Sequence, residues 1–245
     1  MHIKSGLQHR NKEVLVVVPS NPLRKEVNSL IRQHYIKGPS TSHEILVSKR
    51  LRQSELLLPG SYSLGDVLVF IKDFKECKIK KEDQWEVIGS DSDNIIVQSQ
   101  NKTLEFSIID LSKSVEVCKK ELIPLATGER IKWTRNSPSN SFIVNGNEAI
   151  IKEIKNGQVK IELADGQTKK LKFNDRDFKY IDHNYSTTIY SAQGKTVDYI
   201  VGVVRSKEEF LDLTNQRSFY VTISRAKKEV TLITDHYKKS SQIFK

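Results

Sequence analysis

The chain is organised around two polar islands near its end. The first island reads Tyr185-Ser-Thr-Thr-Ile-Tyr-Ser-Ala-Gln-Gly-Lys-Thr-Val-Asp198, and the second reads Asn215-Gln-Arg-Ser-Phe-Tyr-Val-Thr-Ile-Ser-Arg-Ala-Lys227. A short apolar run rich in β-branched residues, 199–204, lies between them, and a strand-like run, 229–234, follows them. The order of loop, strand, loop, helix and strand predicts the end of an α/β lobe.

The triplet Gly194-Lys195-Thr196 ends like a phosphate-binding P-loop but does not meet the full pattern. A P-loop needs another glycine five residues earlier, so that its backbone N–H groups can wrap around phosphates. Ile189 occupies that position. We therefore reject a P-loop here.

The two islands resemble late motifs of superfamily 1 helicases, in particular the RecD-like branch and the helicase part of TraI/TrwC-type conjugative relaxases. Tyr190 is one departure, because the family usually carries histidine there. The resemblance implies the second motor lobe of an ATP-dependent DNA helicase that moves 5′ to 3′. The residues that match motif V are Thr187, Ser191, Gln193, Gly194 and Thr196. The residues that match motif VI are Tyr220, Val221, Ser224, Arg225 and Ala226.

The resemblance also implies roles for the first island. Gln193 and Gly194 would border the ATP cleft. Short hydroxyls, an amide and a glycine suit close approach to phosphate oxygens without reading sequence. The alternative is an ordinary turn rich in serine, threonine and glycine. The residues implied to bind single-stranded DNA are Thr187, Thr188, Ser191, Gln193 and Thr196.

Two arginines are candidates for ATP contacts. Arg225 resembles an arginine finger, which would reach the γ-phosphate in the complete enzyme. A guanidinium stays charged and binds oxyanions with two parallel hydrogen bonds. The alternative is a surface arginine near a helix C-terminus, where cations are mildly favourable. Arg32 follows Asn28 in an N-x-x-I-R phrase that resembles a helix of RecD-type helicases, so it either faces nucleotide or faces solvent.

Composition favours a soluble polyanion-binding protein. The 245 residues suffice for one or two domains, and 40 Lys and Arg against 30 Asp and Glu leave a net charge of +10. Such a charge favours nucleic acid, although a lysine-rich solubilising surface is the alternative. Cys77 and Cys118 form no Cys-x-x-Cys and the histidines are scattered, so no metal site is predicted. The absence of a leader or a long apolar run predicts a cytoplasmic bacterial protein without membrane insertion.

The beginning of the chain has the pattern of a strand followed by a helix. Residues 13–18 form a near-continuous apolar run, which suits a strand covered on both faces. Ser20 or Asn21 can cap the following helix, with Pro22 in its first turn and Gly38 near its end. We assign residues 1–60, with a further candidate strand at 44–48, to the first part of a RecA-like lobe.

The middle of the chain has many short β patterns. Asn156-Gly157 and Asp165-Gly166 predict hairpin turns. We expect two small SH3-like or OB-like β-barrels, 61–121 and 122–181, inserted as a 2B region into a lobe that resumes at 182–245. The candidate strands are 66–71, 84–88, 94–98, 104–108, 115–118, 130–135, 142–144, 148–154, 158–163 and 169–173.

Trp133 lies between Lys132 and Arg135, and two roles suit it. It either stacks on DNA bases, which is worth about 1–3 kcal/mol per base, or fills the core of a small barrel.

The sequence carries no P-loop and no acidic metal-binding motif, so we expect no ATP turnover from this chain alone. It would be an excised fragment or the product of a degenerate gene. ATP and Mg would bind only with the N-terminal RecA-like lobe of the full-length protein. The main hypothesis is the C-terminal motor lobe of a conjugative relaxase-helicase in plasmid transfer. The alternatives are a non-catalytic module that docks to DNA or to type IV secretion coupling machinery, and a repair helicase fragment.

Overall fold

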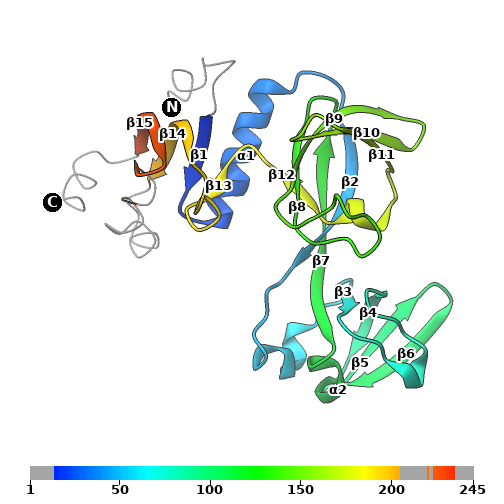
Figure 1. The fold of residues 1–245 in the computed structure, drawn as a ribbon. Helices are drawn as coiled ribbons and strands as arrows, with labels where there is room; N and C mark the ends of the chain where they lie inside the picture. Colours follow the sequence, from blue (N-terminus) through cyan, green and yellow to red (C-terminus); the bar gives the residue numbers. More distant parts are fainter. Residues whose placement is uncertain (1–13, 205–219, 221–222, 235–245) are drawn as a thin grey trace.

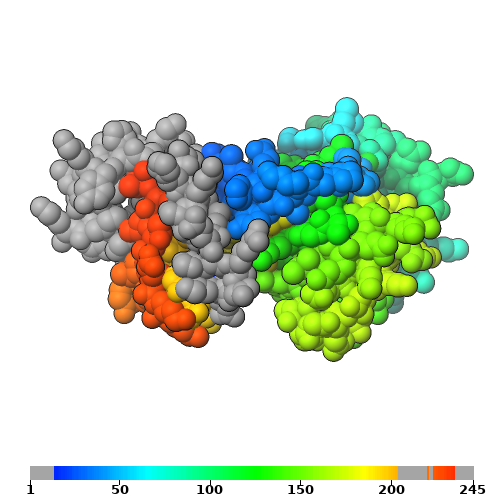
Figure 2. Space-filling model, turned by 90° about the horizontal axis from the view of Figure 1, so that it is seen from above, coloured from blue at the N-terminus to red at the C-terminus, as the bar shows by residue number. Residues whose placement is uncertain are grey.

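The computed structural model describes residues 14–204, 220 and 223–234. This part of the chain is mostly strand and forms one parallel and two antiparallel sheets (Figure 1). The parts lie side by side: β14 and β15 (gold to red) at one end, α1 (blue) in the middle, and the hairpins of β9 to β11 (yellow-green) at the other end (Figure 2).

The four-stranded parallel sheet has the order β13-β1-β14-β15. Its strands are β1 (Val14–Val18), β13 (Thr187–Thr188), β14 (Val197–Val204) and β15 (Ala226–Thr234). The first strand therefore pairs with partners that follow it by more than 160 residues. This confirms the prediction that the α/β lobe is split in sequence.

Helix α1 (Asn21–Tyr35) covers one face of that sheet. Ser20 caps it, because its hydroxyl accepts a hydrogen bond from the backbone N–H of Leu23 at 3.4 Å, and a proline follows at the start of the helix. Leu23, Val27 and Ile31 recur at helical spacing and pack against Val16 and Val201. The cap and the spacing are the features that predicted this helix.

The six-stranded antiparallel sheet has the order β2-β7-β3-β4-β5-β6, and α2 (Ile108–Ser112) follows β6. Its strands are β2 (Thr41–Ser48), β3 (Val67–Phe70), β4 (Gln84–Ser90), β5 (Asn94–Ser99), β6 (Lys102–Ser107) and β7 (Val115–Leu125). Short 3-10 turns span Glu55–Leu57, Pro59–Ser61 and Lys75–Cys77.

Strand β2 corrects the predicted grouping of residues 1–60. It pairs along its whole length with β7 and makes no ladder with the parallel sheet. Ile45 packs with the core of the five-stranded sheet, whereas Leu46 packs with Val67 and Val69 of β3. The ribbon of β2 and β7 is thus covered on both faces, and β7 runs past the predicted boundary at 121/122.

The five-stranded antiparallel sheet has the order β11-β10-β9-β8-β12. Its strands are β8 (Arg130–Trp133), β9 (Glu148–Lys155), β10 (Gln158–Leu163), β11 (Thr168–Lys172) and β12 (Ile181–His183), with a 3-10 turn at Arg176–Lys179. Asn156, Gly157 and Gly166 have φ values of 50°, 71° and 83°, so both predicted hairpin turns use left-handed backbone. The candidate strand at 142–144 is instead a turn, in which Ile143 enters the core.

Trp133 is a core residue, which contradicts the predicted DNA contact. Its exposure is 0%, and it packs in the cluster that contains Ile131, Ile151 and Phe178. It alternates with Lys132 along β8, so Lys132 points to the other face of the sheet. Arg135, the other basic neighbour, lies beyond the end of β8 and pairs with Glu82 at 3.0 Å.

Replacing Trp133 with phenylalanine should be far milder than replacing it with alanine. The indole Nε1 is buried and has no hydrogen-bond partner, so phenylalanine removes an unsatisfied donor while it keeps most of the ring. Trp133→Ala should lower the free energy of unfolding by about 3–5 kcal/mol, and Trp133→Phe by less than about 1.5 kcal/mol. Urea unfolding of both variants measures the difference. Equal losses would show that the ring retained in Trp133→Phe does not restore the core packing.

Candidate functional site

The first island forms a loop that crosses the face of the parallel sheet opposite α1. Two of its side chains anchor it, because Ile189 and Ala192 are buried against Val17 and Ile200. Gly194 has a φ of +85°, a conformation that glycine adopts without strain. Between these anchors the loop turns its polar side chains outward. Its exposed residues are Tyr190, Ser191, Gln193, Gly194, Lys195 and Thr196.

Thr187 and Thr188 do not belong to this exposed surface, which contradicts their predicted DNA contacts. They form β13, pair with Val17 and Val18 of β1, and are only 5% and 8% exposed. The Thr188 hydroxyl donates to Ser191 Oγ at 3.0 Å and accepts from the backbone N–H of Ser191 at 3.3 Å. Its role is to shape the turn that presents the loop.

The structure brings Arg225 beside the first island. The backbone N–H of Val197 donates to the carbonyl of Arg225 at 3.0 Å, and Val197 pairs with Ala226 where β14 and β15 begin. The Arg225 side chain is half-buried, and its Nε has no hydrogen-bond partner among the described residues. Tyr220 is 68% exposed. The rest of the second island, 215–219 and 221–222, including Val221, lies outside the described residues.

Arg32 faces the five-stranded sheet, which contradicts its predicted ATP contact. Its Nε donates to Glu129 Oε2 at 2.9 Å, and its Nη2 donates to Ser40 Oγ at 2.7 Å. Arg24 and Asn28 precede it at intervals of four residues and so share its side of α1. Because α1 lies between the parallel sheet and the antiparallel sheets, this stripe meets the antiparallel side (Figure 1).

Glu129 is the centre of a buried cluster that sequence reasoning missed. Its side chain is fully buried, and it accepts hydrogen bonds from Arg32 and, at 2.6 Å, from the Tyr185 hydroxyl. Burial and then this hydrogen bond raise the pKa of Tyr185. The cluster joins α1, the start of β8 and the segment that leads into the exposed loop. No local pattern signals it, because the partners are about 55 to 97 residues apart in sequence.

Asn28 holds the same segment to α1. Its side-chain oxygen accepts from the backbone N–H and the hydroxyl of Ser186, both at 2.7 Å, and its amide donates to the carbonyl of His183 at 2.9 Å. Asn28 is 2% exposed. Both polar residues of the N-x-x-I-R phrase, Asn28 and Arg32, therefore have structural roles in this chain, because their contacts hold the segment that leads into the exposed loop.

A row of charged side chains links the loop to the five-stranded sheet. Lys132 in β8 lies opposite Asp182 in β12 and Glu148 in β9. Asp182 pairs with Arg24 at 2.6 Å, and Glu148 pairs with Lys195 of the loop. Burial lowers the pKa of Lys132, and the charge of Arg24 lowers it further.

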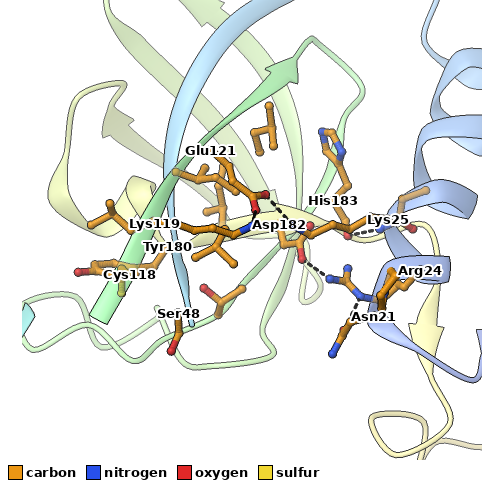
Figure 3. A pocket seen from close by; sticks show the side chains of 18 of the residues that line it. Asn21, Arg24, Lys25, Ser48, Cys118, Lys119, Glu121, Tyr180, Asp182 and His183 are labelled. Carbon is orange, nitrogen blue, oxygen red and sulfur yellow. Dashed lines mark hydrogen bonds and ion pairs between the residues drawn. The ribbon is translucent and has the colours of Figure 1, made fainter. Parts of the chain in front are cut away.

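A cavity of about 830 Å³ lies between α1 and strands β2, β7 and β12 (Figure 3). Several of its cations pair with nearby carboxylates. Lys25 and Lys119 both pair with Glu121, at 2.6 and 2.7 Å, and Arg24 pairs with Asp182. The cavity is on the opposite side of α1 from the parallel sheet, so it is separate from the exposed loop.

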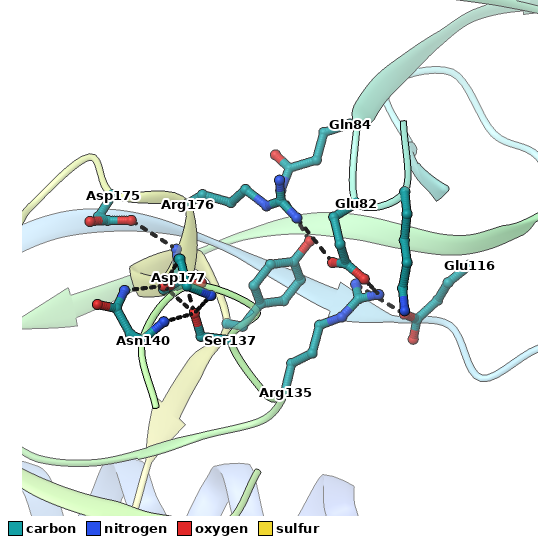
Figure 4. A network of polar contacts seen from close by, with 12 residues as sticks. Glu82, Gln84, Glu116, Arg135, Ser137, Asn140, Asp175, Arg176 and Asp177 are labelled. Atoms are coloured by element: carbon teal, nitrogen blue, oxygen red, sulfur yellow. Dashed lines mark hydrogen bonds and ion pairs between the residues drawn. The ribbon is translucent and has the colours of Figure 1, made fainter. Parts of the chain in front are cut away.

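A second polar cluster joins the two antiparallel sheets (Figure 4). Glu82 accepts from Arg135 at 3.0 Å and from Arg176 at 3.1 Å, and the Gln84 amide donates to the Tyr180 hydroxyl at 3.0 Å. Arg135 also lies 5.1 Å from the centre of the Tyr180 ring. These contacts fix the sheets against each other.

Within the described residues, no group of three or more His, Cys, Asp or Glu side chains is placed to hold a metal ion. Both cysteines are free, and burial raises the pKa of Cys118 to about 12. No helix in the described part of the chain is long and apolar enough to cross a membrane.

Comparison with known proteins gives one curated relative. No protein-family model matches the chain. It is 21% identical to the multifunctional conjugation protein TraI of Escherichia coli K12 in an alignment of 235 residues, which covers 92% of this chain but only 13% of TraI. The chain thus corresponds to a small part of that protein.

Similar solved structures include two Pif1 helicases. Bacteroides Pif1 bound to single-stranded DNA aligns with a TM-score of 0.47 and 14% identity, over 94% of this chain and 42% of its own. Candida albicans Pif1 aligns with a TM-score of 0.45 and 12% identity, over 95% and 49%. The chain spans less than half of either protein. The chain is thus similar in sequence to a part of TraI, which confirms the resemblance to TraI-type proteins that the two islands indicate.

Proposed function

We propose that this chain is the C-terminal motor lobe of an ATP-dependent 5′–3′ DNA helicase of the conjugative relaxase type. The observation that carries the proposal is the junction of the two islands, where Val197 bonds to Arg225 beside an exposed polar loop. In this proposal the parallel sheet with α1 is the RecA-like lobe. The two antiparallel sheets are the inserted SH3-like or OB-like units.

The proposed DNA-contacting residues are those that the loop exposes. Ser191, Gln193 and Thr196 offer two hydroxyls and an amide to phosphate oxygens. Gly194 has no side chain and so leaves room for the DNA backbone to approach. Gln193 and Gly194 would also border ATP. Arg225 would reach the γ-phosphate of ATP and Mg held by a separate phosphate-binding lobe, so this chain alone should not turn over ATP.

Fluorescence anisotropy with labelled single-stranded oligonucleotides tests this proposal. A triple variant, Ser191→Ala, Gln193→Ala and Thr196→Ala, should weaken binding at least tenfold, because hydrogen bonds to charged groups contribute about 1.5–3 kcal/mol each and about 1.4 kcal/mol is a factor of ten.

The matched control replaces exposed residues of the same types on the six-stranded sheet: Ser92→Ala, Gln98→Ala and Thr103→Ala. It should bind like the unmodified protein. Equal affinity of the two triple variants, or no single-strand binding by the unmodified chain at low salt, would overturn the proposed DNA path.

A further inference from the structure

Lysines gather on one face of the five-stranded sheet, in β9 to β11. These strands (yellow-green) lie on the side of the molecule opposite β15 (Figure 2). We define the lysine face as Lys155, Lys160, Lys170 and Lys172, from β9, β10 and β11. All four side chains are exposed. None of them has a carboxylate within 4.0 Å among the described residues, whereas Lys152 on the same sheet pairs with Glu162 at 2.9 Å.

The strand register fixes how these lysines are arranged. Lys160 is directly opposite Lys170, and Gln158 lies between Lys155 on one side and Lys172 on the other. Paired strands are about 4.8 Å apart, and residues i and i+2 on one face are about 6.6 Å apart. The four ammonium groups therefore rise from two neighbouring cross-strand rows.

Lys160 has Glu153 of β9 on one side and Lys170 of β11 on the other. Like charges directly opposite each other in a sheet are destabilising and opposite charges are favourable, so Glu153 offsets part of the repulsion in the Lys160–Lys170 pair. The alternating residues Val159, Ile161 and Leu171 point into the core, so packing holds the strands that carry the lysines. A shallow depression of about 370 Å³ lies over it, lined by residues that include Asn156, Lys160 and Lys170.

We propose that the lysine face binds the phosphate backbone of duplex DNA. Single-strand binders stack bases on aromatic rings, but the outward positions of these rows are filled by lysine, Gln158 and Glu153. Ammonium groups without a stacking surface suit backbone contacts that are independent of sequence. This inference rests on the proposed function, because that function identifies DNA as the polyanion. The lysines that it uses are separate from the exposed loop.

The test is duplex binding by a quadruple variant, Lys155→Gln, Lys160→Gln, Lys170→Gln and Lys172→Gln. Each phosphate contact contributes about 0.9 to the slope of log affinity against log salt, so four contacts steepen it by about 3.6. The variant should therefore bind a labelled duplex at least tenfold more weakly at low salt, with a slope shallower by about 3.6. Single-strand affinity through the loop should change by less than threefold.

The matched control, Lys72→Gln, Lys75→Gln, Lys78→Gln and Lys80→Gln, removes four exposed lysines from the segment between β3 and β4 and lowers the net charge from +10 to +6 as well. It should keep duplex affinity within threefold. Equal weakening in both variants would reduce the effect to overall charge and overturn the inference, as would absence of duplex binding by the unmodified chain. If the unmodified chain bound duplex DNA through the lysine face but did not bind single-stranded DNA, the proposed function would be overturned and the lysine face would stand.

Discussion

Replacing Glu129 with alanine is expected to lower the free energy of unfolding by about 3–5 kcal/mol, which is typical when one partner of a buried ion pair is removed. The Glu129 side chain is 0% exposed and that of Arg32 only 13%. The substitution leaves the Arg32 guanidinium and the Tyr185 hydroxyl without their carboxylate partner in a site that water cannot fully reach. The lost contacts also tie α1 to the segment that enters the exposed loop.

Urea unfolding measures this loss, and Glu121→Ala is its matched control. Glu121 is also a carboxylate with two cationic partners beside α1, but Lys25 and Lys119 are 45% and 51% exposed. Such solvated pairs contribute about 0–1 kcal/mol. If both variants unfold at the same urea concentration, the Glu129 cluster does not stabilise the junction. The double variant Arg32→Ala and Glu129→Ala should lose less than the sum of the single changes, because it leaves no unpaired charge.

The second large effect is expected for Arg225. When this chain is joined to a phosphate-binding lobe, Arg225→Ala should lower ATP turnover by about 10³–10⁵, the range for arginine fingers in phosphoryl transfer. The Arg225 side chain is half-buried, and its buried Nε has no hydrogen-bond partner among the described residues. The measurement is steady-state ATP hydrolysis with saturating single-stranded DNA.

Two further variants distinguish the loss of an arginine finger from the loss of a positive charge. Arg225→Lys keeps the charge but not the planar fork, so turnover should remain low. Lys227→Ala removes an exposed cation two residues farther along, in β15, and should leave turnover within twofold. Single-strand affinity should be unchanged in all three proteins. Unchanged turnover in Arg225→Ala would exclude an arginine finger and count against the motor role.

The elements with local signals were predictable from sequence. The apolar run of β1, the Ser20 cap, the helical spacing of Leu23, Val27 and Ile31, and the left-handed turn at Asn156-Gly157 each depend on residues within a few positions of one another. The two islands were equally local, because each is a short run of matching residues. Sequence therefore sufficed for the split lobe and for the relationship to TraI.

What each polar residue contacts depended on the tertiary structure. Arg32 and Thr188 have residue types that suit phosphate contacts, but Arg32 meets Glu129, which is 97 residues away, and Thr188 is covered by its own loop. A strand pattern likewise shows that β2 exists but not which sheet it joins, because its partners in β7 lie 70 to 84 residues later in the sequence. Burial and ion pairing are properties of positions brought together by folding. The sequence by itself therefore determined the elements and the family likeness, whereas only the tertiary structure decided which side chains remain free to meet DNA or ATP.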